Sequence, residues 1–231
     1  MRQIKKVWKS IPTMEGAGVR LNRAFGFHEV PQGSAKGRMW GFQLWANLPK
    51  GQKMMDPRYR EITSQQIPTV KTPEGATVRI ISGSINGVQG PVKEIVTDPE
   101  YLDVSLPAGK SFTHAIKPGY TAFAYVVEGQ GYFDPGRNAF GREAIGDNYF
   151  DMDRSCVCKE GDIALYERAG DTVLVAADKT PVRFLLVSGK PLKESIAWYG
   201  PIVMNTQQEL ETAFREFQDG SFIKHGAGAS R

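Results

Sequence analysis

Residues 162–188 read DIALYERAGDTVLVAADKTPVRFLLVS. Three apolar runs, at 162–166, 172–176 and 182–188, are separated by segments that contain Gly170, Asp171, Asp178 and Pro181. Short runs rich in Val, Leu and aromatic residues, bounded by Gly, Pro and Asp, are typical of β-strands joined by turns. This stretch therefore predicts consecutive antiparallel strands.

Similar runs recur upstream at short spacing, without long helical patterns between them. The further candidates are 77–82, 92–96, 101–106, 121–127 and 131–133. Alternating side chains at 18–25 and an aromatic-rich run at 39–48 indicate two more strands nearer the N-terminus. Strands at this spacing predict an all-β antiparallel sandwich or small barrel.

One helix is indicated near the C-terminus. Thr206 with Glu209 three residues later has the pattern of a capping box, in which each side chain binds a backbone N–H of the other. An apolar stripe at helical spacing follows, made of Leu210, Ala213, Phe214 and Phe217. Gly220 is placed to end the helix.

Composition excludes several classes of protein. The chain has 231 residues, of which 41% are hydrophobic and 23% charged, which excludes a disordered or collagen-like chain. No stretch has the roughly 18 apolar residues of a membrane span, and the N-terminal MRQIKKVWKS lacks the apolar core of a secretory signal. We therefore expect a cytoplasmic protein with Cys156 and Cys158 as reduced thiols. The basic residues near the N-terminus follow no nucleic-acid-binding motif, so we expect no nucleic-acid partner.

Local motifs for catalysis or metal binding are absent from the sequence. The three histidines, His28, His114 and His225, form no HxH or HExxH arrangement. There is no G-x-S-x-G elbow, no P-loop and no dinucleotide fingerprint. From the residues we assign no catalytic residue and no metal ligand.

Several unusual strings occur in an order that resembles the pirin family. They are GFQLWANLP at 41–49, PRY at 57–59, VRIISG at 78–83, PGY at 118–120, SGKPL at 188–192 and YGPIVMNT at 199–206. The resemblance implies a bicupin, two antiparallel β-barrels in tandem, with a mononuclear iron held by three histidines and a glutamate in the first. Some pirins act as quercetin dioxygenases and others as metal-dependent cofactors of transcription factors.

The sequence departs from the family pattern in its first cupin. In the family, the stretch that carries the metal ligands lies between the regions resembling 27–31 and 36–40. Here only Gln32-Gly33-Ser34-Ala35 fills that interval. The resemblance therefore implies that the metal-binding part of the N-terminal cupin is missing and that iron belongs only to intact family members.

The second cupin also lacks the ligands that the resemblance would require. Gly109 and Gly129 keep the motif spacing, but the ligand positions hold Ala115, Lys117 and Ala122, and a later histidine position falls near Val173. His114 misses the first position by one residue, a slip that turns a strand residue to the other face. We expect a metal-free barrel, with His114, Phe123, Tyr125 and Tyr132 as candidates to line its interior.

These inferences give one architecture. Residues 1–37 form an N-terminal remnant of the first cupin, 38–67 a closing strand and linker, 68–205 a jelly-roll-like cupin barrel, and 206–231 a helix and tail. The remnant strands, near 18–27 and 38–48, lack sheet partners. We therefore expect a homodimer formed through them, because the unpaired backbone groups of an edge strand can hydrogen-bond to a second chain.

Three functions remain open at the level of sequence. The first is a truncated, non-catalytic, metal-free cupin that acts as a scaffold or binds a protein partner. The second is an iron-dependent quercetin 2,3-dioxygenase-type enzyme, with ligands recruited from His28, His114, Glu29 or Glu128. The third is metal-free binding of a small molecule in the barrel mouth.

Overall fold

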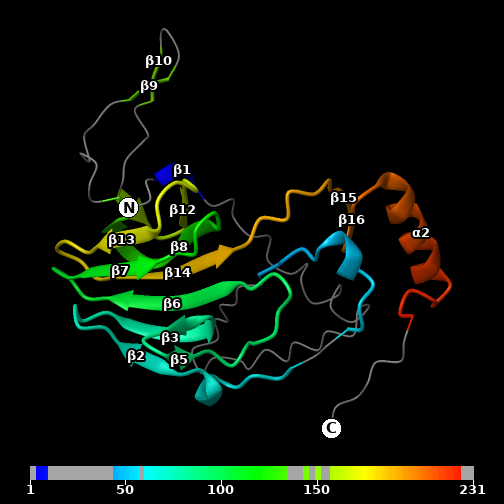
Figure 1. Ribbon diagram of the computed structural model, residues 1–231. Helices are drawn as coiled ribbons and strands as arrows, with labels where there is room; N and C mark the ends of the chain where they lie inside the picture. The colour runs from blue at the N-terminus through cyan, green and yellow to red at the C-terminus, as the bar shows by residue number, and fades with distance from the viewer. Residues whose placement is uncertain are drawn as a thin grey trace, which may run out of the picture. The chain divides into compact units, whose positions relative to one another are not determined.

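A sheet of ten antiparallel strands dominates the computed structural model (Figure 1). The structure describes residues 4–9, 44–57, 60–134, 143–145, 149–151 and 157–224. The path through the sheet is β1-β12-β8-β14-β6-β3-β2, with β11 on β8 and β13 on both β7 and β8. These strands are β1 (Ile4–Lys9), β2 (Thr69–Lys71), β3 (Thr77–Ser82), β6 (Glu100–Leu106), β7 (Ser111–Ala115), β8 (Thr121–Tyr132), β11 (Val157–Lys159), β12 (Asp162–Tyr166), β13 (Thr172–Ala176) and β14 (Val182–Gly189). The predicted all-β cupin fold is confirmed.

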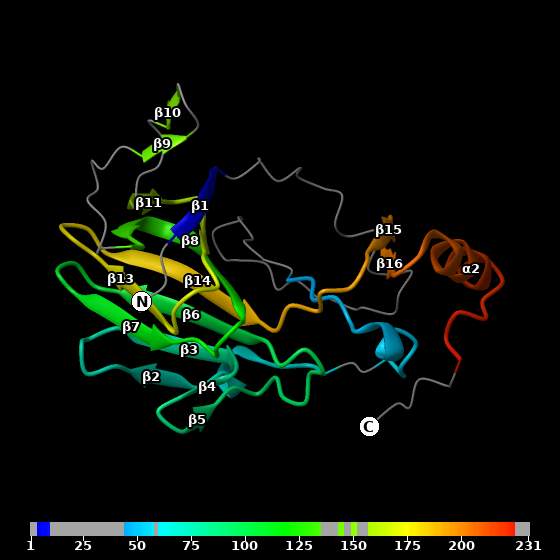
Figure 2. The ribbon, with the colours of Figure 1, turned by 45° about the horizontal axis from the view of Figure 1, so that its top comes forward.

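The twelve-residue strand β8 joins the parts of the sheet. It pairs with β14 along most of its length, with β12 through its first half and with β11 near its end (Figure 2). Gly129 allows the tightest approach, since a Cβ there would lie 2.1 Å from the carbonyl oxygen of Pro181. Its φ of +76° is also a conformation that side chains disfavour.

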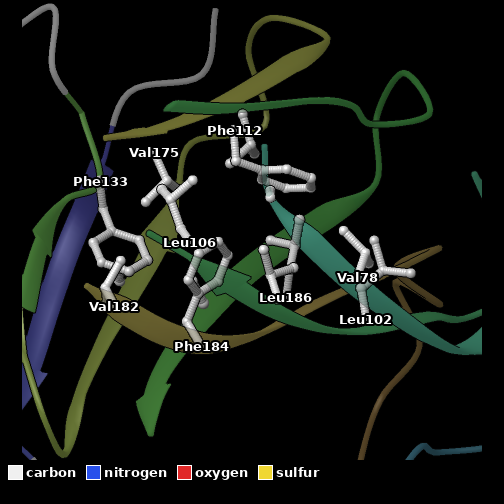
Figure 3. Close-up of a cluster of buried hydrophobic side chains, with 14 of the residues drawn as sticks. Val78, Leu102, Leu106, Phe112, Phe133, Val175, Val182, Phe184 and Leu186 are labelled. Carbon is white, nitrogen blue, oxygen red and sulfur yellow. The ribbon is translucent and has the colours of Figure 1, made fainter. Parts of the chain in front are cut away.

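Apolar side chains on the concave face of the sheet form the main core. In β3 the buried residues alternate with half-buried ones, which places Val78 and Ile80 inside. Figure 3 shows Phe112 from β7 facing Phe184 and Leu186 from β14, and the rings of Phe112 and Phe184 meet edge-on at 6.0 Å. Leu102, Leu106, Phe133, Val175 and Val182 complete the labelled part of the cluster.

Residues 12–61 and 192–231 belong to a second unit, described here by itself. Its ordered elements are a 3-10 turn (Lys50–Gln52), the hairpin of β15 (Ala197–Tyr199) and β16 (Ile202–Met204), and the helix α2 (Gln207–Gln218) (Figure 2). Ile202, Met204, Leu210 and Ala213 are buried between the hairpin and α2. The sequence-based boundaries instead attached residues 192–205 to the barrel.

The predicted capping box at the start of α2 is confirmed. Thr206 Oγ1 accepts a hydrogen bond from the Glu209 backbone N–H at 3.2 Å. The Glu209 carboxylate accepts in return from the backbone N–H of Thr206 at 2.9 Å and of Asn205 at 3.0 Å. The two side chains therefore satisfy backbone groups that the first helical turn leaves without intrahelical partners.

Short pieces complete the secondary structure. They are a 3-10 turn (Ser64–Gln66) and the hairpins β4 (Ser84–Ile85) with β5 (Val88–Gln89) and β9 (Glu143–Ile145) with β10 (Tyr149–Asp151). No helix in the described parts of the chain is both long and apolar enough to cross a membrane. Cys158 is a buried thiol, whereas Cys156 lies outside the described residues.

Two strand predictions differ from the structure. Residues 92–96 form no strand, because Glu94 takes a φ of +57° that breaks an extended run. Residues 44–48, the described end of the expected strand at 38–48, are also outside any strand. The strands β1 and β7 were not predicted. The expected strand at 18–27, and with it the dimer contact, falls outside the described residues and stays a prediction.

Candidate functional site

His114 lies on the concave face of the sheet. Along β7, Phe112 is buried, Thr113 exposed, His114 largely covered and Ala115 exposed, and the next residue, Ile116, is buried again. Because strand residues alternate between faces, His114 shares the inner face with Phe112 and Ile116. The register inferred from Gly109 and Gly129 was therefore wrong. Ala115 and Lys117, which it placed at ligand positions, are both exposed.

Glu100 and Ser188 reach the same end of the concave face from two neighbouring strands. Glu100 begins β6 two residues before buried Leu102, and Ser188 follows buried Leu186 by two residues in β14. The two residues lie opposite each other in the β6–β14 ladder, and Ser188 also lies opposite Ala122 of β8. We call the end of the interior where Glu100, His114 and Ser188 meet the cupin mouth.

Hydrogen bonds join these three side chains. His114 Nε2 lies 2.9 Å from Glu100 Oε2, and Ser188 Oγ lies 3.4 Å from the same oxygen. The side chains of His114 and Glu100 are only 12% and 18% exposed. An ionised carboxylate has no proton to share, so Nε2 carries the hydrogen and donates it to Glu100.

Two neighbours fix the positions of this pair. The His114 ring stacks on Phe112, with centroids 5.9 Å apart and planes inclined by 8°. Gly83 makes room for Glu100, since a Cβ at residue 83 would lie 2.8 Å from Glu100 Cγ and 3.0 Å from Oε1. The carboxylate and the imidazole are thus held by packing as well as by their hydrogen bond.

Asp98, Lys117 and Tyr120 form a charged group beside the mouth. Lys117 Nζ donates to Asp98 Oδ2, and the Tyr120 hydroxyl donates to the same oxygen at 2.9 Å. The Lys117 hydrogen bond holds the pKa of Asp98 below its usual value, and that same bond raises the pKa of Lys117. Burial and the Asp98 hydrogen bond raise the pKa of Tyr120. At neutral pH the lysine is a cation and the tyrosine a neutral hydroxyl.

The mouth and the charged group open on one pocket of about 550 Å³. Glu100, His114 and Ser188 line it together with Asp98, Lys117 and Tyr120. The pocket therefore combines an imidazole and carboxylate pair with an ammonium group and two hydroxyls. Its size lies within the range of small-molecule sites.

Of the four residues proposed to line the barrel, only His114 lines this pocket. Phe123 and Tyr125 are half-buried and alternate with the buried Ala122, Ala124 and Val126, so they project from the opposite face of β8. Tyr132 is partly buried and packs against the edge of the main core.

Sequence reasoning did not identify Glu100, Ser188, Asp98 or Tyr120 as site residues. A usable signal existed for the first two. Glu100 has the same parity as Leu102, Val104 and Leu106, and Ser188 has that of Phe184 and Leu186, so alternation alone places both on the core side. No local pattern marks Asp98 and Tyr120, which meet only through the fold.

The side chains of the described residues do not form an iron site of three histidines and a glutamate. Val173 lies opposite His114 in the β7–β13 ladder. Ala122 and Ile116 are further buried apolar residues. Within the described ranges, no three His, Cys, Asp or Glu residues gather as metal ligands would. His28, Glu29 and His225 lie outside those ranges, and Glu128 is exposed. Iron prefers imidazole and carboxylate ligands, and the mouth offers one of each.

Comparison with known proteins explains the architecture. The sequence profile of the Pirin C-terminal cupin domain matches residues 101–223. The chain belongs to the pirin family. A pirin-like protein of Caulobacter vibrioides is 35% identical over 205 residues, covering 88% of this chain and 66% of the relative. Pirin of Rattus norvegicus is 33% identical over 189 residues, covering 81% of this chain and 58% of the relative.

A solved structure is also similar to this chain. The crystal structure of a quercetin 2,3-dioxygenase from Acinetobacter baumannii superposes with a TM-score of 0.63 at 27% identity, covering 77% of this chain and 55% of that protein. This pirin-family chain therefore spans between about half and two-thirds of the length of these relatives.

Proposed function

We propose that this pirin-family chain binds a small oxygen-rich molecule in the cupin mouth, as a binding module that needs no metal ion in that barrel. The observation that carries the proposal is the 2.9 Å pair of His114 and Glu100 at the wall of a 550 Å³ pocket. Polar groups placed beside an apolar core are costly unless they are paired, either with each other or with a ligand. Among the described residues, His114 Nδ1 and Glu100 Oε1 have no partner, and both residues line the pocket, which favours ligand binding over the other metal-free role, that of a scaffold alone.

The polar groups suggest the chemistry of the ligand. In the described part of the chain, Glu100 Oε1 has no hydrogen-bond partner and can accept a hydroxyl donor. The Lys117 ammonium has three hydrogens, so besides its bond to Asp98 it can donate to a carbonyl or carboxylate oxygen of a ligand in this pocket. A small molecule with a hydroxyl group next to a carbonyl group meets both requirements.

The binding test uses the full chain purified with a chelator. We expect dihydroxyacetone or glyceraldehyde to shift the backbone NMR signals of Thr113, His114 and Lys117 saturably. The Glu100→Ala variant should lose this response, whereas Glu160→Gln, a change of an exposed carboxylate outside the pocket, should keep it. If neither compound perturbs these signals at millimolar concentration, ligand binding at the mouth is refuted.

A second candidate function is a quercetin 2,3-dioxygenase activity. It is favoured by the 27% identity with the Acinetobacter baumannii protein of that name. The required iron site would need ligands beyond the His114 and Glu100 pair. Loading the chain with ferrous iron, measuring bound metal and following oxygen uptake with quercetin tests this candidate. Stoichiometric iron with oxygen uptake would establish it and displace the metal-free proposal.

The short connection Gln32-Gly33-Ser34-Ala35 bears on both candidates. We propose that this chain lacks the metal-binding part of the first cupin, which agrees with the 66% and 58% coverage of its relatives. The second barrel then carries whatever function remains.

A further inference from the structure

We propose that His114 and Glu100 act as a base dyad, which removes a proton from the carbon next to a carbonyl group and so isomerises or epimerises the bound molecule. This inference rests on the proposed function, because the substrate is the hydroxy carbonyl compound that the mouth would bind. It adds a reaction to a site otherwise argued to bind only.

The hydrogen bond to Glu100 selects the reactive nitrogen. In the neutral form of His114 with the hydrogen on Nε2, which Glu100 accepts, the lone pair lies on Nδ1. Among the described residues, Nδ1 has no hydrogen-bond partner. A neutral imidazole with one nitrogen held by a carboxylate is well suited to act as a general base, since the carboxylate fixes its tautomer and stabilises the imidazolium that forms.

Packing prepares the dyad for this role. Phe112 stacks on the imidazole, Ser188 donates to the carboxylate, and the absence of a side chain at Gly83 lets Glu100 approach. Ser188 is only 4% exposed, so bulk water does not compete for its hydrogen bond with Glu100. Ser188 is thus a positioning residue. Glu100 holds the imidazole through Oε2 and would contact the substrate hydroxyl through Oε1, whereas His114 is the group that would take the proton.

Lys117 supplies the complementary charge. Proton removal next to a carbonyl places negative charge on the carbonyl oxygen, and an ammonium group near that oxygen stabilises it. The Lys117 side chain lies over the Tyr120 ring, with Nζ 5.6 Å from the ring centroid, and lines the same pocket as His114. The pocket therefore holds a base and a cation, the two groups that the reaction requires.

The step balances without a redox partner. The C–H bond breaks, its proton moves to His114 Nδ1, and its electron pair forms the C=C bond of an enolate while the carbonyl π pair moves to oxygen. Return of the proton to the original carbon regenerates the substrate or gives its epimer. In a hydroxy ketone, the proton on His114 can instead be delivered to the former carbonyl carbon. The hydroxyl group on the original carbon then gives its proton to the former carbonyl oxygen, which produces the isomer. No oxidant, reductant or metal ion enters the balance.

Exchange in D₂O tests the proposal with defined probes. The chain, treated with a chelator, is mixed with dihydroxyacetone or with glyceraldehyde, and loss of the signal of the C–H next to the carbonyl group is followed by proton NMR. Binding of each probe is measured in parallel by titration calorimetry. We expect protein-dependent exchange of at least one probe, with the Glu160→Gln control unchanged.

Variants separate the base from its support. We expect His114→Asn to lower the exchange rate by at least about 100-fold, the lower end of a general base contribution. Glu100→Gln removes the charge and one acceptor oxygen, so it should lower the exchange rate by a larger factor than it weakens binding, which a merely structural role would not produce. Glu100→Gln also keeps the test informative if His114→Asn fails to fold.

The outcomes distinguish the two proposals. Binding of a probe without exchange overturns the dyad and leaves the proposed function intact. Exchange that persists in His114→Asn also overturns the dyad. If no probe binds, both proposals are refuted, and His114 and Glu100 are a structural pair that closes the mouth.

Discussion

Arg183 donates two hydrogen bonds to Asp103, from Nε to Oδ1 at 2.9 Å and from Nη2 to Oδ2 at 2.8 Å. The two residues come from the paired strands β14 and β6, on the convex face of the sheet. Asp103 is only 7% exposed, and its hydrogen bond raises the pKa of Arg183. A planar guanidinium matches a carboxylate at two points, which makes this one of the stronger kinds of surface interaction.

Replacing Arg183 tests the strength of this contact. We expect Arg183→Met to lower the free energy of unfolding by about 2 kcal/mol, because a covered carboxylate loses two charge-assisted hydrogen bonds. Arg79 also approaches Asp103, but its Nη1 lies 3.9 Å from Oδ2, which is beyond hydrogen-bonding distance. Arg79→Met should therefore cost less than about 1 kcal/mol. Urea unfolding measures both, and equal losses would contradict the assigned difference.

Gly83 and Gly87 provide a matched pair of substitutions. Both have a positive φ, of +96° and +82°, so alanine is strained at either position. A Cβ at Gly83 would also press on Glu100, whereas one at Gly87 would meet nothing within 4 Å. We expect Gly83→Ala to cost at least about 1 kcal/mol more than Gly87→Ala in urea unfolding. Only Gly83→Ala should disturb the NMR signals of the His114 ring. Equal costs would show that the Glu100 side chain moves away from the new Cβ without lowering the stability.

Tyr166 carries a buried hydroxyl with no hydrogen-bond partner among the described residues. Removing an unpaired buried hydroxyl relieves its desolvation cost, so Tyr166→Phe should be about 1 kcal/mol more stable than the parent at pH 7. Burial, with smaller contributions from Cys158 and Asp134, raises the pKa of Tyr166 well above its ordinary value. A loss of stability in Tyr166→Phe at pH 7 would reveal a partner for the hydroxyl.

The same residue gives a pH dependence. Above pH 10 the unfolded chain releases the Tyr166 proton while the folded chain keeps it, so stability is complete below pH 10 and falls as pH rises beyond it. Tyr166→Phe lacks this loss. The stability difference between Tyr166→Phe and the parent should therefore grow between pH 9 and pH 11 in urea unfolding, and a constant difference would contradict the shift.

Glu209 predicts a second pH dependence, at the acid end. Burial alone would raise its pKa, but hydrogen bonds from the backbone of Asn205 and Thr206, together with the Lys50 ammonium, hold it below the ordinary value. Its contribution is present above pH 4.5 and is lost as pH falls through the lowered pKa. Glu209→Gln keeps the capping geometry without the charge. Its stability deficit relative to the parent, followed by helical circular dichroism during urea unfolding, should shrink towards pH 3.

Much of the sheet could be predicted from the sequence because its strands bury one face. The runs at 77–82, 162–166 and 172–176 alternate clearly and match β3, β12 and β13 residue for residue. The capping pattern of Thr206 and Glu209 likewise located α2, because capping is a local interaction.

The mouth was harder to predict because its register is set by tertiary packing. The glycine spacing around β7 predicted that His114 points away from the interior, whereas the burial of Phe112 and Ile116 places it on the inner face. The β7 sequence SFTHA contains a single large apolar residue, so no strand stood out. The pairing of His114 with Glu100 joins residues from different strands, which one-dimensional patterns do not reveal.

The pairing of β1 with β12 has a consequence for biosynthesis. Ile4 lies opposite Tyr166 and Lys9 opposite Asp162, so β1 leaves the ribosome long before the strand with which it pairs. Until then its backbone groups are open to water, chaperones or other nascent chains. Completion of this sheet edge is therefore a late event in folding, whatever the speed of the local hairpins.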